Sequence, residues 1–295
     1  MIDRLGIRTE DRVFTIAFGV SLAAHLLFLV GQLLQLDWFT VRRDLGPIEV
    51  VYNYEMARES AQDMRAQLSR AQRDAIGAPV PGSFGERMVQ EQLRARGLTD
   101  DRLLSAFRKV PRHRFVPRDY HTEAYADHPL PIGEQQTISQ PYIVALMISH
   151  LRLQGHERVL ELGAGSGYQL AILAELALEV YSIERIPELA ERAERRLREC
   201  GYANVHLSAG NGTLGWPEHA PYDAIIVSAA APEIPSALIR QLGDPGRLLI
   251  PLGSSKAQML TLIVQRQGQV SRHELTPCTF VPLIGAEGWP DVSDP

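Results

Sequence analysis

The sequence of 295 residues has little cysteine and no excess of basic residues, and each shortage excludes a class of protein. Cys200 and Cys278 are the only cysteines, so there is no disulfide framework, and no CxxC or Cys/His cluster indicates zinc. We expect both thiols to be buried or inert. The formal net charge of −5 lacks the basic signature of a nucleic-acid-binding protein. A phosphate loop with Gly-Lys-Ser/Thr is also absent, which disfavours a P-loop nucleotide site.

Charge is missing altogether from one long stretch near the N-terminus. Residues 13–36 read VFTIAFGVSLAAHLLFLVGQLLQL, between Arg12 and Asp37. A helix of roughly 20 mostly apolar residues can cross a bilayer, and Trp38 follows where an interfacial aromatic belt belongs. We predict a transmembrane helix at 13–36, within an N-terminal segment 1–46. A buried helix is the alternative, and a signal peptide fits less well because no small-residue cleavage site follows.

Proline and glycine mark the boundary of the main domain. Residues 47–83 are predicted to be a spacer or linker that ends in the run GAPVPGS. A compact domain is expected over 84–289, followed by a short acidic tail at 290–295. Within the domain, 112–140 is a long irregular segment with several prolines and the polar run EQQTISQ. Loops this long inside a compact domain are usually functional or disordered, and the residue mix favours function.

Strand and helix patterns alternate regularly from residue 158 onward. Strands are expected at 158–162, 179–183, 204–207, 222–227 and 247–251, and helices at 168–178, 187–200 and 234–242. This alternation predicts βαβ units, a mainly parallel sheet and the α/β class. Two further strand-like runs, 259–265 and 269–280, flank Gly268 and predict an antiparallel final hairpin.

A glycine-rich turn follows the first strand of this alternation. Gly163, Gly165 and Gly167 can adopt backbone angles closed to other residues and let a ligand approach the main chain. Glu184 ends the next strand, where an acid can accept hydrogen bonds from ribose hydroxyls. The GxGxG spacing differs from the GxGxxG dinucleotide fingerprint. The turn and the acid together therefore favour a nucleoside with a small charged tail, namely S-adenosylmethionine.

Glu161 lies just before this turn and allows two interpretations. Its carboxylate can accept hydrogen bonds from backbone N–H groups of the loop, or it can hold the amino-acid tail of the cofactor indirectly.

Several separated motifs make the chain resemble the protein-L-isoaspartate (D-aspartate) O-methyltransferase family over roughly 88–285. The motifs are VPRHRFV at 110–116, PLPIG at 129–133, QTISQPY at 136–142, VLELGAGSGY at 159–168, YSIER at 181–185, YDAIIV at 222–227 and FVPL at 280–283. The glycine turn is common to many methyltransferases, whereas TISQP is far more specific to this family. The resemblance implies a Rossmann-like methyltransferase fold with an antiparallel final hairpin. It also implies methyl transfer from S-adenosylmethionine to the α-carboxylate of L-isoaspartyl residues in damaged proteins.

The resemblance further implies which residues form the site. Ser139 matches the family's active-site serine, and we expect its hydroxyl to orient the substrate carboxylate; the alternative is a cap for the helix that begins at Pro141. Substrate-binding residues are expected to be Pro131, Ile132, Gln136, Thr137, Ile138 and Gln140. Cofactor-binding residues are expected to be Glu161, Gly163, Gly165, Gly167, Tyr168, Glu184 and Asn211, and no metal ligand is expected.

Asn211 departs from the pattern of the family, which usually has Gly-Asp-Gly where this chain has Gly-Asn-Gly at 210–212. Asparagine keeps a carbonyl that can accept from the adenine amino group but lacks the charge. The loss of charge can lower cofactor affinity by up to about 1–2 kcal/mol, and the alternative, which we favour, is a neutral change.

Two other functions stay open at this stage: a related methyltransferase with another acceptor, and a non-catalytic, membrane-anchored binding module. The intact polar run at 136–142 argues against the module. Three arginines before the span weakly favour a cytoplasmic N-terminus, which would place the domain away from cytoplasmic S-adenosylmethionine. We nevertheless predict a cytoplasm-facing, monomeric catalytic domain whose partners are isoaspartyl proteins and peptides, with no nucleic acid.

Overall fold

The computed structural model describes residues 81–290, so the predicted transmembrane helix at 13–36 and nearly all of the 47–83 spacer lie outside the described residues. Within 81–290, no helix combines the length and apolarity that a bilayer-spanning segment needs. The first described helix, α5 (Pro81–Met88), begins inside the predicted spacer.

A continuous helical stretch opens the domain and changes its winding along the way. Helix α5 passes into the π-helix η2 (Val89–Leu93) and the 3₁₀-helix η3 (Arg94–Arg96). The stretch ends at Gly97, which has a left-handed backbone with φ +88°. Helix α6 (Asp101–Lys109) follows, capped by the side chain of Asp100.

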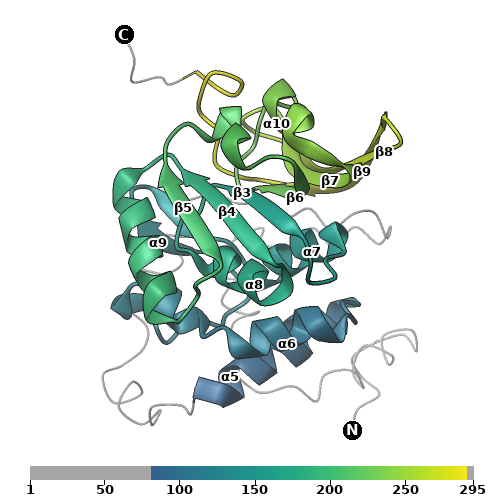
Figure 1. Ribbon diagram of the computed structural model, residues 1–295. Coiled ribbons are helices and arrows are strands. Elements are labelled where there is room, and N and C mark those ends of the chain that lie inside the picture. The colour runs from purple at the N-terminus through teal and green to yellow at the C-terminus, as the bar shows by residue number, and fades with distance from the viewer. Residues whose placement is uncertain (1–80, 291–295) are drawn as a thin grey trace, which may run out of the picture. The chain divides into compact units, whose positions relative to one another are not determined.

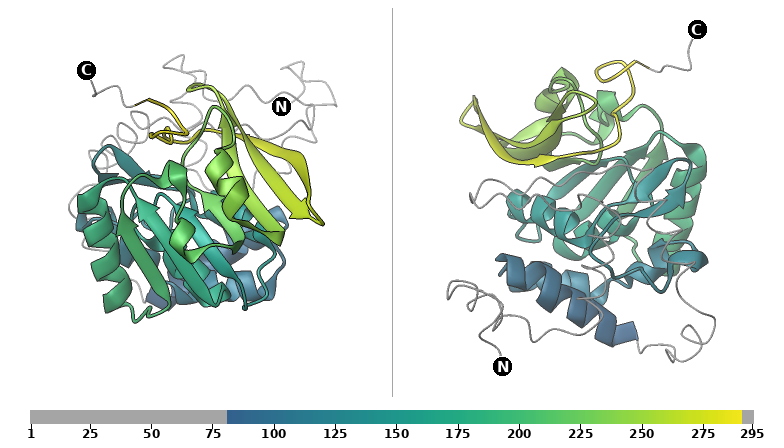
Figure 2. Two further views of the ribbon diagram at one scale, coloured as in Figure 1. Left: turned by 45° about the horizontal axis from the view of Figure 1, so that its top comes forward. Right: turned by 180° about the vertical axis from the view of Figure 1, so that it is seen from behind.

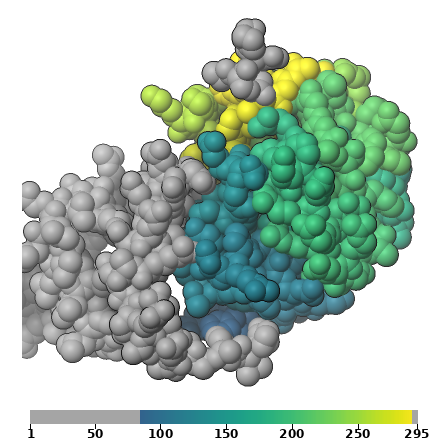
Figure 3. Space-filling model, turned by 90° about the vertical axis from the view of Figure 1, so that its left-hand side faces the viewer, coloured from purple at the N-terminus to yellow at the C-terminus, as the bar shows by residue number. Residues whose placement is uncertain are grey.

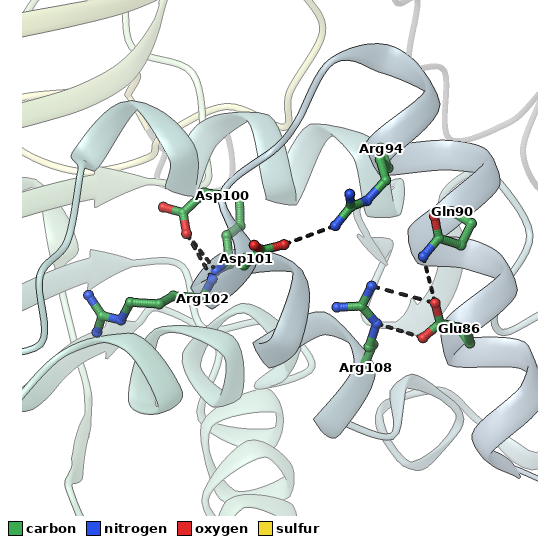
Figure 4. A network of polar contacts seen from close by, with 8 residues as sticks. Glu86, Gln90, Arg94, Asp100, Asp101, Arg102 and Arg108 are labelled. Carbon is green, nitrogen blue, oxygen red and sulfur yellow. Dashed lines mark hydrogen bonds and ion pairs between the residues drawn. The ribbon is translucent and has the colours of Figure 1, made fainter.

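Ion pairs tie these first helices together at the surface (Figure 4). The Arg108 Nε atom lies 2.6 Å from Glu86 Oε2 and joins α6 to α5. Arg94 Nη2 lies 2.9 Å from Asp101 Oδ1 at the start of α6. Because these side chains are largely exposed, each pair contributes only about 0–1 kcal/mol, and buried apolar contacts hold the helices in place.

The segment predicted to be irregular contains short regular elements. Two 3₁₀-helices, η4 (Arg112–Phe115) and η5 (Arg118–Tyr120), precede an antiparallel hairpin of β1 (Leu130–Gly133) and β2 (Gln136–Ile138). Proline in a short run argues against a strand, which is why the sequence did not indicate this hairpin. Helix α7 (Pro141–Leu151) then begins with proline at its first position, as predicted.

A seven-stranded sheet forms the centre of the domain in the order β5-β4-β3-β6-β7-β8-β9 (Figure 1). The strands are β3 (Arg158–Leu162), β4 (Glu179–Glu184), β5 (Val205–Ala209), β6 (Tyr222–Val227), β7 (Leu242–Gly253), β8 (Gln258–Arg266) and β9 (Gln269–Cys278). Strands β3 to β7 pair in parallel, and β7, β8 and β9 pair antiparallel. The predicted α/β fold with an antiparallel final hairpin is confirmed, and Figure 2 shows this hairpin at one end of the sheet.

Strand β7 begins five residues earlier than predicted. Its first part contains Gly243, Pro245 and Gly246, residues that normally indicate a turn. This part is kept in the sheet by pairing on both sides, with Tyr222 opposite Leu242 and Gln265 opposite Gly246. Tertiary pairing therefore overrides the local signal.

Helices cover both faces of the sheet (Figures 1 and 2). Helices α7, α8 (Tyr168–Leu176) and α9 (Pro187–Glu199) share one apolar core, against which α6 also packs. Helix α10 (Ser236–Gln241) packs in a second core on the other face. Strand β3 is apolar on both faces because both are covered: Val159 belongs to the first core and Leu160 to the second. Figure 3 shows the residues before the sheet, in blue and teal, packed directly against its green elements.

Both cysteines are free thiols, as expected. Cys278 is buried at the end of β9, and burial raises its pKa to about 12. Cys200 is half-buried, and burial also raises its pKa. Thiolate, the reactive form, is therefore disfavoured at both positions.

Candidate active site

A cavity of about 570 Å³ lies where the parallel strands end. Its wall combines the turn after β3, the end of β4, the residues after β6, the β2 hairpin strand and the segment after β9. Ligands in sheets of this kind bind beyond the carboxyl ends of the strands, and the volume is in the usual range for small-molecule sites of about 300–1,000 Å³.

The three glycines of the turn have left-handed backbones but different surroundings. Their φ angles are +88° at Gly163, +52° at Gly165 and +87° at Gly167, so a side chain would be strained at each. Gly163 and Gly165 line the cavity. Gly167 is outside the cavity wall, and a Cβ atom there would lie 3.3 Å from the Cβ of Ala193. Gly167 therefore allows close packing of α8 against α9, whereas the other two leave the main chain open to a ligand.

Glu184 holds the turn from the end of β4. One carboxylate oxygen accepts a hydrogen bond from the N–H of Gly165 at 2.9 Å, and the other accepts from the N–H of Ile186 at 2.9 Å. The side chain is largely buried and lines the cavity. Binding a loop N–H was one of the two roles considered for Glu161, and in the structure Glu184 has it.

Glu161 has a different set of partners. Its Oε1 atom accepts hydrogen bonds from Gln169 Nε2 at 3.0 Å and from the Ser228 hydroxyl at 3.4 Å. Its Oε2 atom is buried and has no hydrogen-bond partner in the described part of the chain, although Glu161 lines the cavity. Burial raises the pKa of this carboxyl well above its usual range, and nearby Glu184 adds to the shift. An acceptor of this kind suits a hydrogen-bond donor or a cation supplied by a ligand.

Two predicted cofactor residues remain, Tyr168 and Asn211, and they differ in their position relative to the cavity. Tyr168 borders the cavity, but its ring is buried against Phe107 and Phe115. Asn211 is exposed and absent from the cavity wall within 81–290. Its Oδ1 atom accepts hydrogen bonds from the Thr213 N–H at 3.0 Å and hydroxyl at 2.7 Å, so it caps a short 3₁₀-helix.

Ser139 lines the same cavity as the glycine turn. Its hydroxyl has no hydrogen-bond partner within residues 81–290, and the cap position of α7 is Gln140, which makes no side-chain cap bond. The alternative that Ser139 caps α7 is therefore not observed. The Ser139 side chain is left half-buried at the cavity, where it can donate to a ligand.

The other predicted substrate residues fall into two groups. Gln136, Thr137 and Ile138 lie in β2 and line the cavity together with Ser139. The wall of the cavity does not include Pro131, Ile132 and Gln140. Pro131 pairs with Thr137 across the hairpin, and Gln140 donates from Nε2 to the Asp127 carbonyl at 2.9 Å. Ile132 packs against the glycine turn, since a Cβ atom at Gly165 would lie 3.5 Å from its Cδ1 atom.

A buried arginine that the sequence analysis did not single out fixes this loop. Arg112 is fully buried and donates from Nη2 to the Ser139 carbonyl and from Nε to the Ala124 carbonyl, both at 2.7 Å. Its guanidinium lies 4.7 Å from the ring centroid of Tyr168, the first residue of α8. Arg112 thus connects the loop of Ser139 to the helix that follows the glycine turn.

Several further wall residues were also missed. Ser228 and Ala229 directly follow β6, so the rule that ligands bind at strand ends could have found them. The segment from Phe280 to Ile284 reaches the cavity through backbone hydrogen bonds in which Ala230 pairs with Val281 and Leu283, each at 2.8 Å. No spacing in the sequence indicates that contact.

The parallel sheet, the glycine turn and the acid at the end of the second strand define a Rossmann-like S-adenosylmethionine-dependent methyltransferase. Comparison with known proteins identifies the family. The family model for protein-L-isoaspartate(D-aspartate) O-methyltransferase matches residues 85–288.

Curated relatives and solved structures agree with this match. The protein-L-isoaspartate O-methyltransferase of Methanoculleus marisnigri is 55% identical over 204 residues, which cover 69% of this chain and 93% of the relative. Protein-L-isoaspartate O-methyltransferase 1 of Syntrophobacter fumaroxidans is 53% identical over 204 residues, covering 69% and 95%. A solved protein-L-isoaspartate O-methyltransferase superposes with a TM-score of 0.63 at 29% identity, covering 69% of this chain and 67% of that one. A putative enzyme of this kind from Plasmodium falciparum, in complex with S-adenosyl-L-homocysteine, shares the fold with a TM-score of 0.61 at 24% identity, covering 68% and 98%.

The chain belongs to the protein-L-isoaspartate(D-aspartate) O-methyltransferase family. It is a carboxyl methyltransferase that uses S-adenosylmethionine and acts on isoaspartyl residues of proteins, consistent with protein repair.

Proposed function

We propose that the cavity holds S-adenosylmethionine beside the α-carboxylate of an L-isoaspartyl residue, and that Ser139 orients this carboxylate. One observation carries the proposal: a single cavity is lined both by the glycine turn and by Ser139, whose hydroxyl has no partner within 81–290. The same wall holds the neighbouring residues Gln136 and Thr137, which can bind the peptide.

The cofactor is proposed to lie along the glycine turn. Each Glu184 oxygen accepts one backbone N–H and has capacity to accept a second hydrogen bond, from a ribose hydroxyl. Gly163 and Gly165 leave the main chain open beside it. The unpaired Oε2 atom of Glu161 is an acceptor suited to the ammonium of the methionine tail. The residues present therefore fit a nucleoside with a cationic amino-acid tail.

The chemistry requires alignment more than acid–base catalysis. S-adenosylmethionine supplies a methyl group that is already electrophilic, and an ionised carboxylate is already a nucleophile. The Ser139 hydroxyl donates a hydrogen bond to one carboxylate oxygen and thereby fixes the direction of the other. Ile138, buried beside it, helps to exclude water. Alignment of two reactants can contribute about 7–11 kcal/mol to lowering a barrier.

Two variants, one expected to change kcat and the other the cofactor Kd, test these assignments. Ser139→Ala should lower kcat for an isoaspartyl peptide by about 10- to 100-fold, the value of a hydrogen bond to a charged group, and leave the cofactor Kd unchanged. Glu184→Gln should raise the cofactor Kd by at least about tenfold. Glu188→Gln, at an exposed position of α9, is the matched control for Glu184. Calorimetry gives the Kd, and transfer of labelled methyl groups gives the rate.

A matched aspartyl peptide serves as the substrate control. Labelling should be confined to the isoaspartyl member of the pair. Equal labelling of both peptides would contradict the proposed substrate, whereas unchanged turnover by Ser139→Ala would contradict only the role of the serine.

We further propose that residues 13–36 anchor a monomeric catalytic domain at the cytoplasmic face of a membrane. The support is the uncharged run itself and the need for cytoplasmic S-adenosylmethionine. The full chain should sediment with membranes, and a chain that begins at residue 47 should stay in the supernatant as a monomer. A reporter fused after Pro295 that is active only outside the cytoplasm would contradict this orientation.

A further inference from the structure

Lysine is scarce in this chain, and one of its two lysines stands at the cavity. Lys109 is paired, with its Nζ atom 2.6 Å from Glu175 Oε2. Lys256 lies in the turn between β7 and β8, is exposed, and lines the cavity. No residue within 81–290 forms an ion pair with it.

The turn that carries Lys256 is held firmly in place. The Ser254 hydroxyl accepts hydrogen bonds from the N–H groups of Lys256 at 3.3 Å and Ala257 at 3.2 Å. The buried side chain of Gln258 donates to the Ser254 carbonyl at 2.9 Å and accepts from the Phe280 N–H at 2.7 Å. The backbone of Lys256 is therefore fixed beside the segment that follows β9, while its long side chain is free to reach a ligand.

The other charged residues of the cavity wall are already committed. Glu161 is buried, Glu184 holds the glycine turn, and Arg185, which directly follows Glu184 on the side of the cavity proposed for the cofactor, has an interaction of its own. Within the described part of the chain, Arg185 and Lys256 are the two cations of the wall, and Lys256 is the one fixed beside the segment after β9. A lysine is a mobile point charge, which suits an acidic side chain at a variable position.

We propose that Lys256 is a specificity-determining residue that favours isoaspartyl sites with an acidic side chain next to them in the peptide. This inference rests on the proposed function, because it needs the peptide to occupy this cavity. Methyl transfer neutralises the reacting carboxylate, so a cation bound to that carboxylate would oppose the reaction. Lys256 is exposed and can instead pair with an acidic side chain next to the isoaspartyl residue. Such a pair strengthens binding of the peptide and does not affect the reacting carboxylate. The preference should therefore appear in KM rather than in kcat.

Peptides with a single changed neighbour test this inference on the full chain. Each peptide carries one isoaspartyl residue, is acetylated and amidated at its ends, and has Glu, Gln or Lys at one position within two residues on either side. Blocked ends ensure that the charge comes from the flanking side chain and not from a terminal carboxylate. At low salt, kcat/KM should be about two- to fivefold higher with Glu than with Gln on the favoured side, the range for an exposed ion pair, and lowest with Lys.

Two variants of Lys256 and one control complete the design. Lys256→Gln should remove the preference for Glu, and Lys256→Glu should reverse the order of the Glu and Lys peptides. Lys109→Gln removes the same charge outside the cavity and should keep the order of the wild type. Raising the salt to about 0.5 M should also weaken the preference, because exposed charges are then screened within a few ångströms.

The outcomes separate this inference from the function on which it rests. If all isoaspartyl peptides are methylated at rates independent of the flanking charge, the role of Lys256 is contradicted and the proposed function stands. An equal loss of preference in Lys109→Gln would also contradict it, because the effect would then come from net charge. If no isoaspartyl peptide is methylated, both proposals fail.

Discussion

The two halves of the cavity are built in different ways. The half that we propose for the cofactor, called the cofactor half, comes from consecutive elements, β3, the glycine turn, α8 and β4, so its residues follow one another along the chain. The half that we propose for the substrate, called the substrate half, is assembled from three distant pieces: the hairpin strand with Ser139, the turn at Lys256, and the segment after β9. The first half is complete within one strand–turn–helix–strand unit, whereas the second needs contacts between separate parts of the chain to exist at all.

Buried polar side chains supply those long-range contacts. Arg112 binds the carbonyl of Ser139, and Gln258 joins the Lys256 turn to Phe280. In the cofactor half, the corresponding contact joins Glu184 to the N–H of Gly165 within one strand–turn–helix–strand unit. The comparison teaches that the substrate half should be the more sensitive to loss of a single buried side chain.

The largest effect is expected from Arg112→Met, which breaks the substrate half. The change leaves the carbonyls of Ser139 and Ala124 without their arginine donor, and the free energy of unfolding should fall by about 3–5 kcal/mol. Because the loop of Ser139 loses its support, kcat should fall more than cofactor affinity. Urea unfolding, calorimetry and methyl transfer measure the three quantities.

Two further variants make this prediction specific. Arg112→Lys keeps the charge and should recover part of the stability. Arg87→Met, in an exposed pair with Glu91, should change stability by less than about 0.5 kcal/mol. If Arg112→Met weakened cofactor binding as much as turnover, the loop would not be the part that Arg112 holds.

A smaller effect is expected in the cofactor half from Glu161→Gln, and it depends on pH. Burial raises the folded-state pKa of Glu161 above the ordinary value of 4.5, so the folded protein keeps this proton after the unfolded chain has lost it. Wild-type stability should therefore fall as pH rises from about 4.5 to the folded pKa, by up to about 1.4 kcal/mol per pH unit, and then level off. The variant lacks this loss, so its stability relative to wild type should increase with pH over that window.

Thermal unfolding of both proteins across pH 5 to 8, without cofactor, measures this difference. The Gln side chain keeps an oxygen that can accept from Gln169, which limits other changes. Two curves that stay parallel over the whole range would show that Glu161 ionises alike in the folded and unfolded states.

The same division explains how much the sequence could predict. The glycine turn, Glu184 and the succession of strands along the chain follow from local patterns, and the structure contains them within a few residues of their expected positions. Ser139 was found through a motif rather than through physics. The sequence did not indicate the roles of Arg112, Lys256 and the segment at Phe280. Their positions depend on hydrogen bonds between residues far apart in sequence. Gly167 belongs to a pattern that the sequence analysis recognised, but its packing role was not predicted. Its packing partner Ala193 belongs to the next helix, α9.

The smallest effect is expected at Asn211, where the sequence left a loss of cofactor affinity and a neutral change open. The family pattern suggested that the missing charge lowers cofactor affinity by up to about 1–2 kcal/mol. In the structure Asn211 is exposed, lies outside the cavity wall and uses its Oδ1 atom to accept hydrogen bonds from Thr213.

Asn211→Asp should therefore change the cofactor Kd by less than about threefold and leave stability nearly unchanged, since Asn and Asp are equivalent caps. Asn211→Ala should cost about 1 kcal/mol of stability through loss of the cap. A tenfold gain of affinity in Asn211→Asp would instead place this side chain at the adenine and extend the cofactor half beyond the turn.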